Sequence, residues 1–137
     1  MTTFKKDFPD IVEAVVTQCD IFSPDGYRVH TDNALWDTGA ETTVISSRIV
    51  KKLHLNPHNQ GYLSGIGGTS VSNVYLVHIL VPTGNYVADI EVMEDDAIDN
   101  DIIIGTDVIM LGDFLITNAD EKTTFQFRTP SEGGVEL

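Results

Sequence analysis

A single acidic residue, set between an apolar run and a tight turn, constrains this chain more than any other feature. In residues 34–40, three apolar residues lead into Asp37, and small residues follow it. The apolar run favours a buried strand, and the small residues let the backbone and a ligand approach the carboxylate closely. We therefore expect the fold to hold Asp37 at a defined position.

Two further stretches follow Asp37 along the chain. Residues 65–68 read Gly-Ile-Gly-Gly between strand-like residues, and residues 102–105 form an apolar run that ends in glycine. An apolar run of this length is typical of a short, fully buried strand. Taken alone, Asp37 would fit an ordinary turn, and the glycine-rich stretch would fit a plain hairpin tip. The order of the three stretches is what indicates a functional site.

Those three stretches, in that order, resemble the motifs of the retropepsins, which are single-lobe aspartic proteases of retroviruses, retrotransposons and some cellular and bacterial proteins. The resemblance spans about residues 12–127. It implies a mainly β fold, a closed, barrel-like acid-protease lobe with one or two short helices and a flap hairpin. It also implies that Asp37 is the catalytic residue of an aspartic endopeptidase.

The resemblance assigns supporting roles around the catalytic turn and the flap. The residues concerned are Thr38, Gly39, Ala40, Gly65, Ile66, Gly67, Gly68, Ile104 and Gly105. Those after Asp37 would brace the turn and expose its backbone to the substrate, and the flap glycines would close over the peptide. The last two would pack against the turn. Two residues depart from the retroviral pattern: Trp36 replaces an aliphatic residue, and Thr106 replaces an arginine.

Aspartic-protease chemistry needs two carboxylates a hydrogen bond apart, one ionised and one protonated. The chain contains the sequence Asp-Thr-Gly once and shows no internal repeat. A single-lobe chain must then supply Asp37 twice, through a two-fold homodimer acting on a peptide or protein substrate. No cofactor is required. The alternative is a non-catalytic dimeric module that binds peptides or serves as a scaffold, which would share every motif.

Length, composition and charge narrow the remaining possibilities. With 137 residues and 42% hydrophobic residues, we expect a single domain, 1–137, with a core over about 11–128 and polar tails at both ends. The 21 acidic residues outnumber the 8 basic ones, and no Lys or Arg occurs from residue 53 through 121. This balance argues against nucleic-acid partners and anionic membranes. The lone Cys19 and the lack of a membrane-length apolar run predict a cytoplasmic protein.

The hydrophobic pattern predicts many strands and few helices. Strands are expected over residues 11–22, 27–30, 34–36, 60–64, 69–81, 86–93, 102–105, 114–116 and 123–127. A turn is expected at 31–33, and short helices over 44–53, with Ser46 as a plausible N-cap, and over 106–111. The four histidines and the acidic run at 89–101 match neither a zinc motif nor an EF-hand loop, so we predict no metal site.

Overall fold

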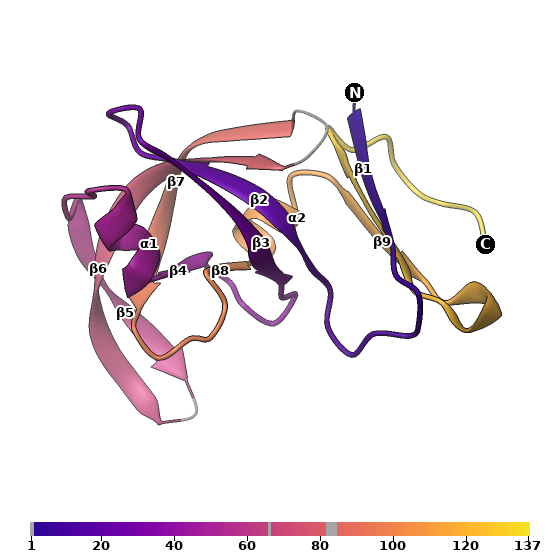
Figure 1. Cartoon of the computed structure of the whole chain (residues 1–137), viewed down its shortest axis with the longest axis horizontal. Coiled ribbons are helices and arrows are strands. Elements are labelled where there is room, and N and C mark those ends of the chain that lie inside the picture. The colour runs from indigo at the N-terminus through magenta and orange to yellow at the C-terminus, as the bar shows by residue number, and fades with distance from the viewer. Residues whose placement is uncertain (1, 66, 82–84) are drawn as a thin grey trace.

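Strands dominate the computed structural model, which describes residues 2–65, 67–81 and 85–137 (Figure 1). The strands are β1 (Thr2–Asp7), β2 (Val16–Phe22), β3 (Arg28–Trp36), β4 (Val44–Ser46), β5 (Asn59–Gly65), β6 (Gly68–Val81), β7 (Asn85–Asp95), β8 (Ile102–Ile104), β9 (Asp113–Thr117) and β10 (Thr124–Thr129). The helical segments are α1 (Ser47–Lys52), α2 (Thr106–Ile109) and the 3-10 turn η1 (Ala119–Glu121). In these ranges no helix has the length and apolarity needed to cross a membrane.

Six of the strands close into a ring. Hydrogen-bonded neighbours follow the order β2, β3, β8, β4, β7 and β6, and β6 pairs again with β2, where Ile21 lies opposite Ile79. Closing a sheet in this way removes the unpaired edges that an open sheet would expose. β5 pairs with β6 outside the ring, and the two extend away from it as a long hairpin (Figure 1). The mainly β, barrel-like lobe predicted from the sequence is thus confirmed.

The ring is filled by apolar side chains that alternate along its strands. On β6, Val77, Ile79 and Val81 are all buried, and on β8 both Ile102 and Ile104 are fully buried. Ile103 points to the opposite face of β8, as the two-residue period of a strand requires. β8 therefore has one face in the core and one face toward the cleft described below.

A three-stranded antiparallel sheet, ordered β1, β10 and β9, lies beside the ring (Figure 1). Trp36 at the end of β3 joins the two sheets, because its ring centroid lies 4.9 Å from those of both Phe125 and Phe127. Its indole N–H donates to Thr17 Oγ1 at 2.9 Å, which satisfies the buried polar group. Phe4 on β1 is 4% exposed and packs edge-on against Phe125.

β1 corrects the expectation of a polar N-terminal tail and of a core beginning near residue 11. Phe4 is a single buried aromatic residue among lysines and threonines, so the sequence shows no alternating pattern that would predict a strand. The strand is stabilised by its pairing with β10, in which Phe4 lies opposite Phe127. Long-range pairing of this kind cannot be read from a local pattern. β10 ends at Thr129, and residues 130–137 after it are exposed.

Two local expectations near the middle of the chain were wrong. Residues 31–33 continue β3 instead of turning, but they include a bulge: between the pairs Thr17–Ala34 and Cys19–Thr31, β3 has one residue more than β2. Residues 44–46 form β4, pairing with β7 and β8, so the helix begins only at Ser47. The N-cap prediction is confirmed: the Ser46 side chain accepts from Ile49 N at 3.4 Å.

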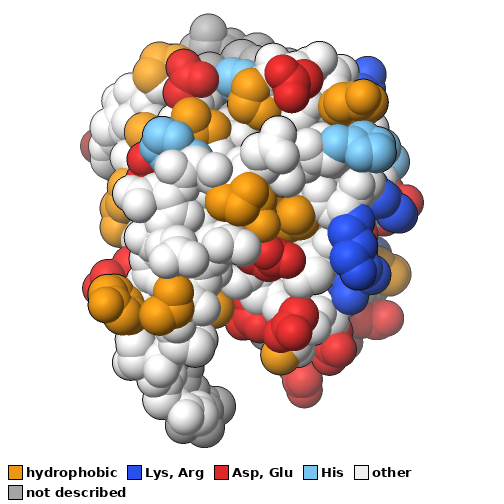
Figure 2. All heavy atoms as spheres, turned by 90° about the vertical axis from the view of Figure 1, so that its left-hand side faces the viewer, with side chains coloured by type: hydrophobic (Ala, Val, Ile, Leu, Met, Phe, Trp, Pro, Cys, Tyr) orange, Lys and Arg blue, Asp and Glu red, His pale blue; other side chains and the backbone are white. Residues whose placement is uncertain are grey.

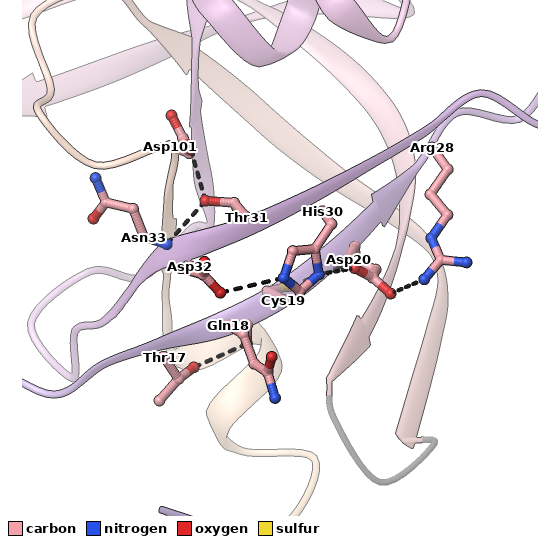
Figure 3. A network of polar contacts seen from close by, with 10 residues as sticks. All are labelled: Thr17, Gln18, Cys19, Asp20, Arg28, His30, Thr31, Asp32, Asn33 and Asp101. Atoms are coloured by element: carbon pink, nitrogen blue, oxygen red, sulfur yellow. Dashed lines mark hydrogen bonds and ion pairs between the residues drawn. The ribbon is translucent and has the colours of Figure 1, made fainter. Parts of the chain in front are cut away.

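Charged side chains line the outer face of the β2–β3 pair (Figure 3). Asp20 accepts a hydrogen bond from Arg28 Nη2 at 2.6 Å and lies 2.6 Å from His30 Nδ1. His30 Nε2 lies 3.2 Å from Asp32 Oδ1. The hydrogen bond to Asp20, followed by that to Asp32, raises the pKa of His30 above its ordinary value of 6.5. His30 therefore bridges two carboxylates when it is protonated.

Replacing His30 with glutamine should make the free energy of unfolding less dependent on pH. A histidine whose pKa is raised by folding contributes its full stabilisation below the unfolded value of 6.5 and loses it as pH rises through the folded value. In urea denaturation between about pH 5 and 8, the stability gap between parent and His30→Gln should be widest at the acidic end. A gap that does not change with pH would contradict this role.

The control for this measurement is His54→Gln. His54 contacts the ring of Tyr27, with centroids 4.7 Å apart, instead of a carboxylate. Its stability change, measured over the same pH range, is the reference against which the effect of His30→Gln is compared.

Candidate functional site

Asp37 opens a turn directly after β3, and three hydrogen bonds hold that turn. The Asp37 N–H donates to the carbonyl of Ile104 at 2.9 Å, and the Asp37 carbonyl accepts from Ala40 N at 3.2 Å. Asp37 Oδ1 accepts from Gly39 N at 2.8 Å. The side chain is partly buried, whereas Thr38 and Gly39 beside it are exposed. The carboxylate is thus fixed in place and remains accessible at the end of a core strand.

β8 runs parallel to the end of β3, with Trp36 opposite Ile104. The residue after β8, Gly105, lies so close to the turn that a Cβ atom there would be 2.6 Å from the carbonyl oxygen of Ala40 and 3.0 Å from the carbonyl carbon of Thr42. Real Cβ atoms do not approach a backbone so closely, so glycine is needed at this position. The structure brings Ile104 and Gly105 directly against the Asp37 turn.

Thr43, which is fully buried, and the partly buried Asp107 form a polar link that no sequence motif singled out. Asp107 Oδ1 accepts from Thr43 Oγ1 at 2.7 Å, and Asp107 Oδ2 accepts from Thr43 N at 2.9 Å. Thr43 Oγ1 in turn accepts from Gly105 N at 3.1 Å. The sequence feature that could have drawn attention to Asp107 is its position two residues after Gly105, the glycine that follows the buried strand. Its partner, 64 residues away, could not be inferred from the sequence.

A cleft of about 880 Å³ opens beside the Asp37 turn. It is large enough for a segment of extended peptide. Its lining comes from the turn, from β4 and β8, from both strands of the β5–β6 hairpin and from the end of β7. The lining residues are Asp37, Gly39, Ala40, Glu41, Thr42, Val44, Tyr62, Leu63, Ser64, Gly67, Gly68, Thr69, Ser70, Met93, Asp95, Ile98 and Ile103.

The β5–β6 hairpin forms the wall of the cleft opposite Asp37. Its strands pair from Asn59 opposite Val74 to Gly65 opposite Gly68. Gly68 has a φ of +111°, in the left-handed region that favours glycine, whereas the backbone of Gly67 lies outside that region. Ile66, predicted at the tip, lies outside the described residues. The hairpin therefore lines the cleft together with Asp37, although the two are distant in the sequence.

The structure brings five of the predicted site residues to one cleft and leaves others at its margin. Those in the lining are Asp37, Gly39, Ala40, Gly67 and Gly68. Thr38, Ile104 and Gly105 adjoin these residues without lining the cleft, and Gly65 pairs with Gly68 at the end of the hairpin. Elsewhere, burial raises the pKa of the Cys19 thiol to about 12, which makes this residue unsuitable as a nucleophile.

Comparison with known proteins identifies the family. The family model described as "Aspartyl protease" matches residues 19–108, a range that includes the Asp37 turn, the hairpin and β8. Because this match covers more than half of the chain, the protein belongs to the aspartyl protease family. No curated protein sequence matches the chain significantly.

Two solved structures share the fold. The EIAV protease in complex with the inhibitor HBY-793 gives a TM-score of 0.54 at 21% identity, covering 72% of this chain and 86% of that one. A retropepsin-like aspartic protease from Rickettsia conorii gives a TM-score of 0.51 at 9% identity, covering 93% and 95%. The retropepsin-like fold suggested by the three motifs is confirmed.

The two glycines of the hairpin offer a matched pair of substitutions. Gly68→Val should strain the backbone because valine disfavours a φ of +111°, at a cost of about 1–3 kcal/mol or a rearranged hairpin. Gly67→Val should be tolerated, since a Cβ there would meet no atom within 4 Å. Amide hydrogen exchange over residues 59–74 should be faster in Gly68→Val alone. Equal effects of the two substitutions would show that the left-handed backbone at Gly68 does not shape the hairpin.

Proposed function

We propose that the protein is an aspartic endopeptidase that works as a homodimer, with Asp37 supplied once by each subunit. One observation carries the proposal. The carboxylate of Asp37 is held by its own turn on one wall of a peptide-sized cleft, and a glycine-containing hairpin forms the other wall. Family membership supports the same chemistry.

The proposed reaction uses the two Asp37 carboxyl groups as a pair that shares one proton. Two adjacent carboxylates repel each other, so the pair holds one proton, and its titration belongs to both residues together. The ionised member takes a proton from water as the water attacks the scissile carbonyl, and the protonated member donates to the carbonyl oxygen. Proton transfer to the amide nitrogen then releases the amine. No metal and no covalent intermediate are required.

The neighbouring residues have supporting roles in this proposal. Gly39 and Ala40 let the substrate backbone approach, and Thr38, exposed beside Asp37, braces the turn across the dimer axis. The hairpin, which contains Gly65, Gly67 and Gly68, closes over an extended peptide and excludes bulk water, and Ile66, which lies between them in the sequence, is assigned to the same flap. Ile104 and Gly105 act as positioning residues through their contacts with the turn.

Replacing Asp37 with asparagine should abolish peptide cleavage while leaving the fold and the dimer intact. Asparagine can still accept from Gly39 N but cannot act as a base, so a loss of about a thousandfold or more is expected in a peptide-library digest. A statine-type transition-state mimic should bind the parent far more tightly than the variant. Full activity in Asp37→Asn would end the aspartic-protease proposal.

Asp25→Asn is the matched control. Asp25 is exposed on the turn between β2 and β3 and does not line the cleft, so the same chemical change there should leave cleavage unaltered. The digest also separates catalysis from the alternative of a non-catalytic peptide-binding module. Such a module would bind peptides at the cleft and release them uncut.

Dimerisation should tighten as salt rises. Each subunit carries −13, so a dimer formally carries −26 (2 × 13), and this repulsion opposes association at low ionic strength. Apolar contacts resist salt, whereas the repulsion is screened once the Debye length falls to about 10 Å, near 0.1 M. Sedimentation analysis from about 0.02 to 0.2 M salt should show the dimer fraction increasing, and specific activity at low protein concentration should follow it. A monomer under every condition would exclude the shared site.

A further inference from the structure

Every charged side chain that lines the cleft, among the residues the structure describes, is acidic. Asp37 lies at the catalytic turn, Glu41 follows that turn, and Asp95 lies at the end of β7. The remaining lining residues are glycine, alanine, serine, threonine, tyrosine and larger apolar residues. Whatever occupies the cleft therefore meets negative charge beyond that of the catalytic pair.

No basic side chain of the described chain neutralises these carboxylates. The structure gives Glu41, which is exposed, no ion pair in the ranges it describes. Asp95 Oδ1 accepts only a backbone hydrogen bond, from Ala97 N at 2.9 Å. Arg48, the last arginine before the long stretch without basic residues, is bound elsewhere: its Nη2 donates to Asp101 Oδ1 and to two carbonyl oxygens of the same loop, each at 3.3 Å.

Acidic and basic side chains occupy different parts of this face of the molecule (Figure 2). The β5–β6 hairpin projects at the lower left, and a hollow separates it from a group of acidic side chains at the lower centre. The Lys and Arg side chains lie to the right of this group. A cleft with low-dielectric walls and one sign of charge concentrates the electrostatic field within it. Ligand charge should therefore affect binding more strongly here than on an open surface.

We propose that the cleft selects peptides that carry lysine or arginine close to the cleaved bond, with Glu41 and Asp95 as the specificity-determining carboxylates. This inference rests on the proposed function, because it assigns the substrate class of the same site. In a two-fold dimer each subunit contributes one Glu41 and one Asp95. The preference for cationic residues then extends to both sides of the cleaved bond.

A set of peptides identical except for one flanking residue tests the selection. The flanking residue is lysine, glutamine or glutamate, at positions up to about four residues either side of the bond cleaved in a library digest. At about 0.05 M salt, kcat/KM should be at least about tenfold higher for the lysine peptide than for the glutamate peptide, and the ratio should fall as salt rises to about 0.5 M. Equal kcat/KM values for the two peptides would overturn the proposal.

Glu41→Gln and Asp95→Asn assign the preference to named residues. Each should lower the lysine-to-glutamate ratio severalfold, and Asp95→Asn retains the oxygen that accepts from Ala97 N. The control is Asp25→Asn, which removes the same unit of charge outside the cleft and should leave the ratio unchanged. If Asp25→Asn lowered the lysine-to-glutamate ratio as much as Glu41→Gln does, the preference would come from net charge. The assignment to Glu41 and Asp95 would then be wrong.

Peptide binding distinguishes failure of this inference from failure of the proposed function. Fluorescence anisotropy of the labelled lysine and glutamate peptides is measured with Asp37→Asn, alone and combined with Glu41→Gln. If Asp37→Asn binds the lysine peptide more tightly than the glutamate peptide, and this difference is lost when Glu41→Gln is added, selection for cationic peptides is supported even if the parent cleaves no peptide. If the parent cleaves both peptides equally and the variant binds them equally, catalysis stands and charge selection is excluded.

Discussion

The hydrogen bonds of Thr43 hold together the elements around the candidate site. Its side chain connects Asp107 of α2 with the backbone of Gly105, and its carbonyl accepts from Met93 N of β7 at 3.1 Å. β4, β7, the end of β8 and the start of α2 thus meet at one fully buried threonine. Removing its hydroxyl would leave the buried Gly105 N without its partner, at a cost of about 1–3 kcal/mol. Asp107 would lose one hydrogen bond and keep those from Thr43 N and Val108 N.

The Asp37 turn depends on the same arrangement. Gly105, positioned by Thr43, leaves no room for a side chain against Ala40 and Thr42, and Thr106 N donates to the Ala40 carbonyl at 2.7 Å. The carboxylate is therefore held from behind by packed backbone and faces open space in front. Such preorganisation matters for chemistry, because a reacting group that is already in place need not be ordered during reaction.

Local patterns predicted the elements around the candidate site better than the long-range contacts that hold those elements together. The Asp37 turn, the hairpin, β8 and the Ser46 cap each rest on residues adjacent in sequence, where propensity and turn chemistry operate. β1, the full length of β3 and the Thr43–Asp107 link depend on partners far along the chain. A hydroxyl and a carboxylate that lie 64 residues apart show no periodicity, so only the folded structure reveals their contact.

The position of Trp36 also makes its fluorescence a probe of the candidate site. It is the single tryptophan of the chain, it immediately precedes Asp37, and it is 5% exposed. Its indole ring rests on Phe125 and Phe127, and its N–H is bound to Thr17. Intrinsic fluorescence of the folded protein therefore comes from an apolar environment one residue from the carboxylate. A change in emission with ligand or assembly would arise at the junction of the two sheets, without any added label.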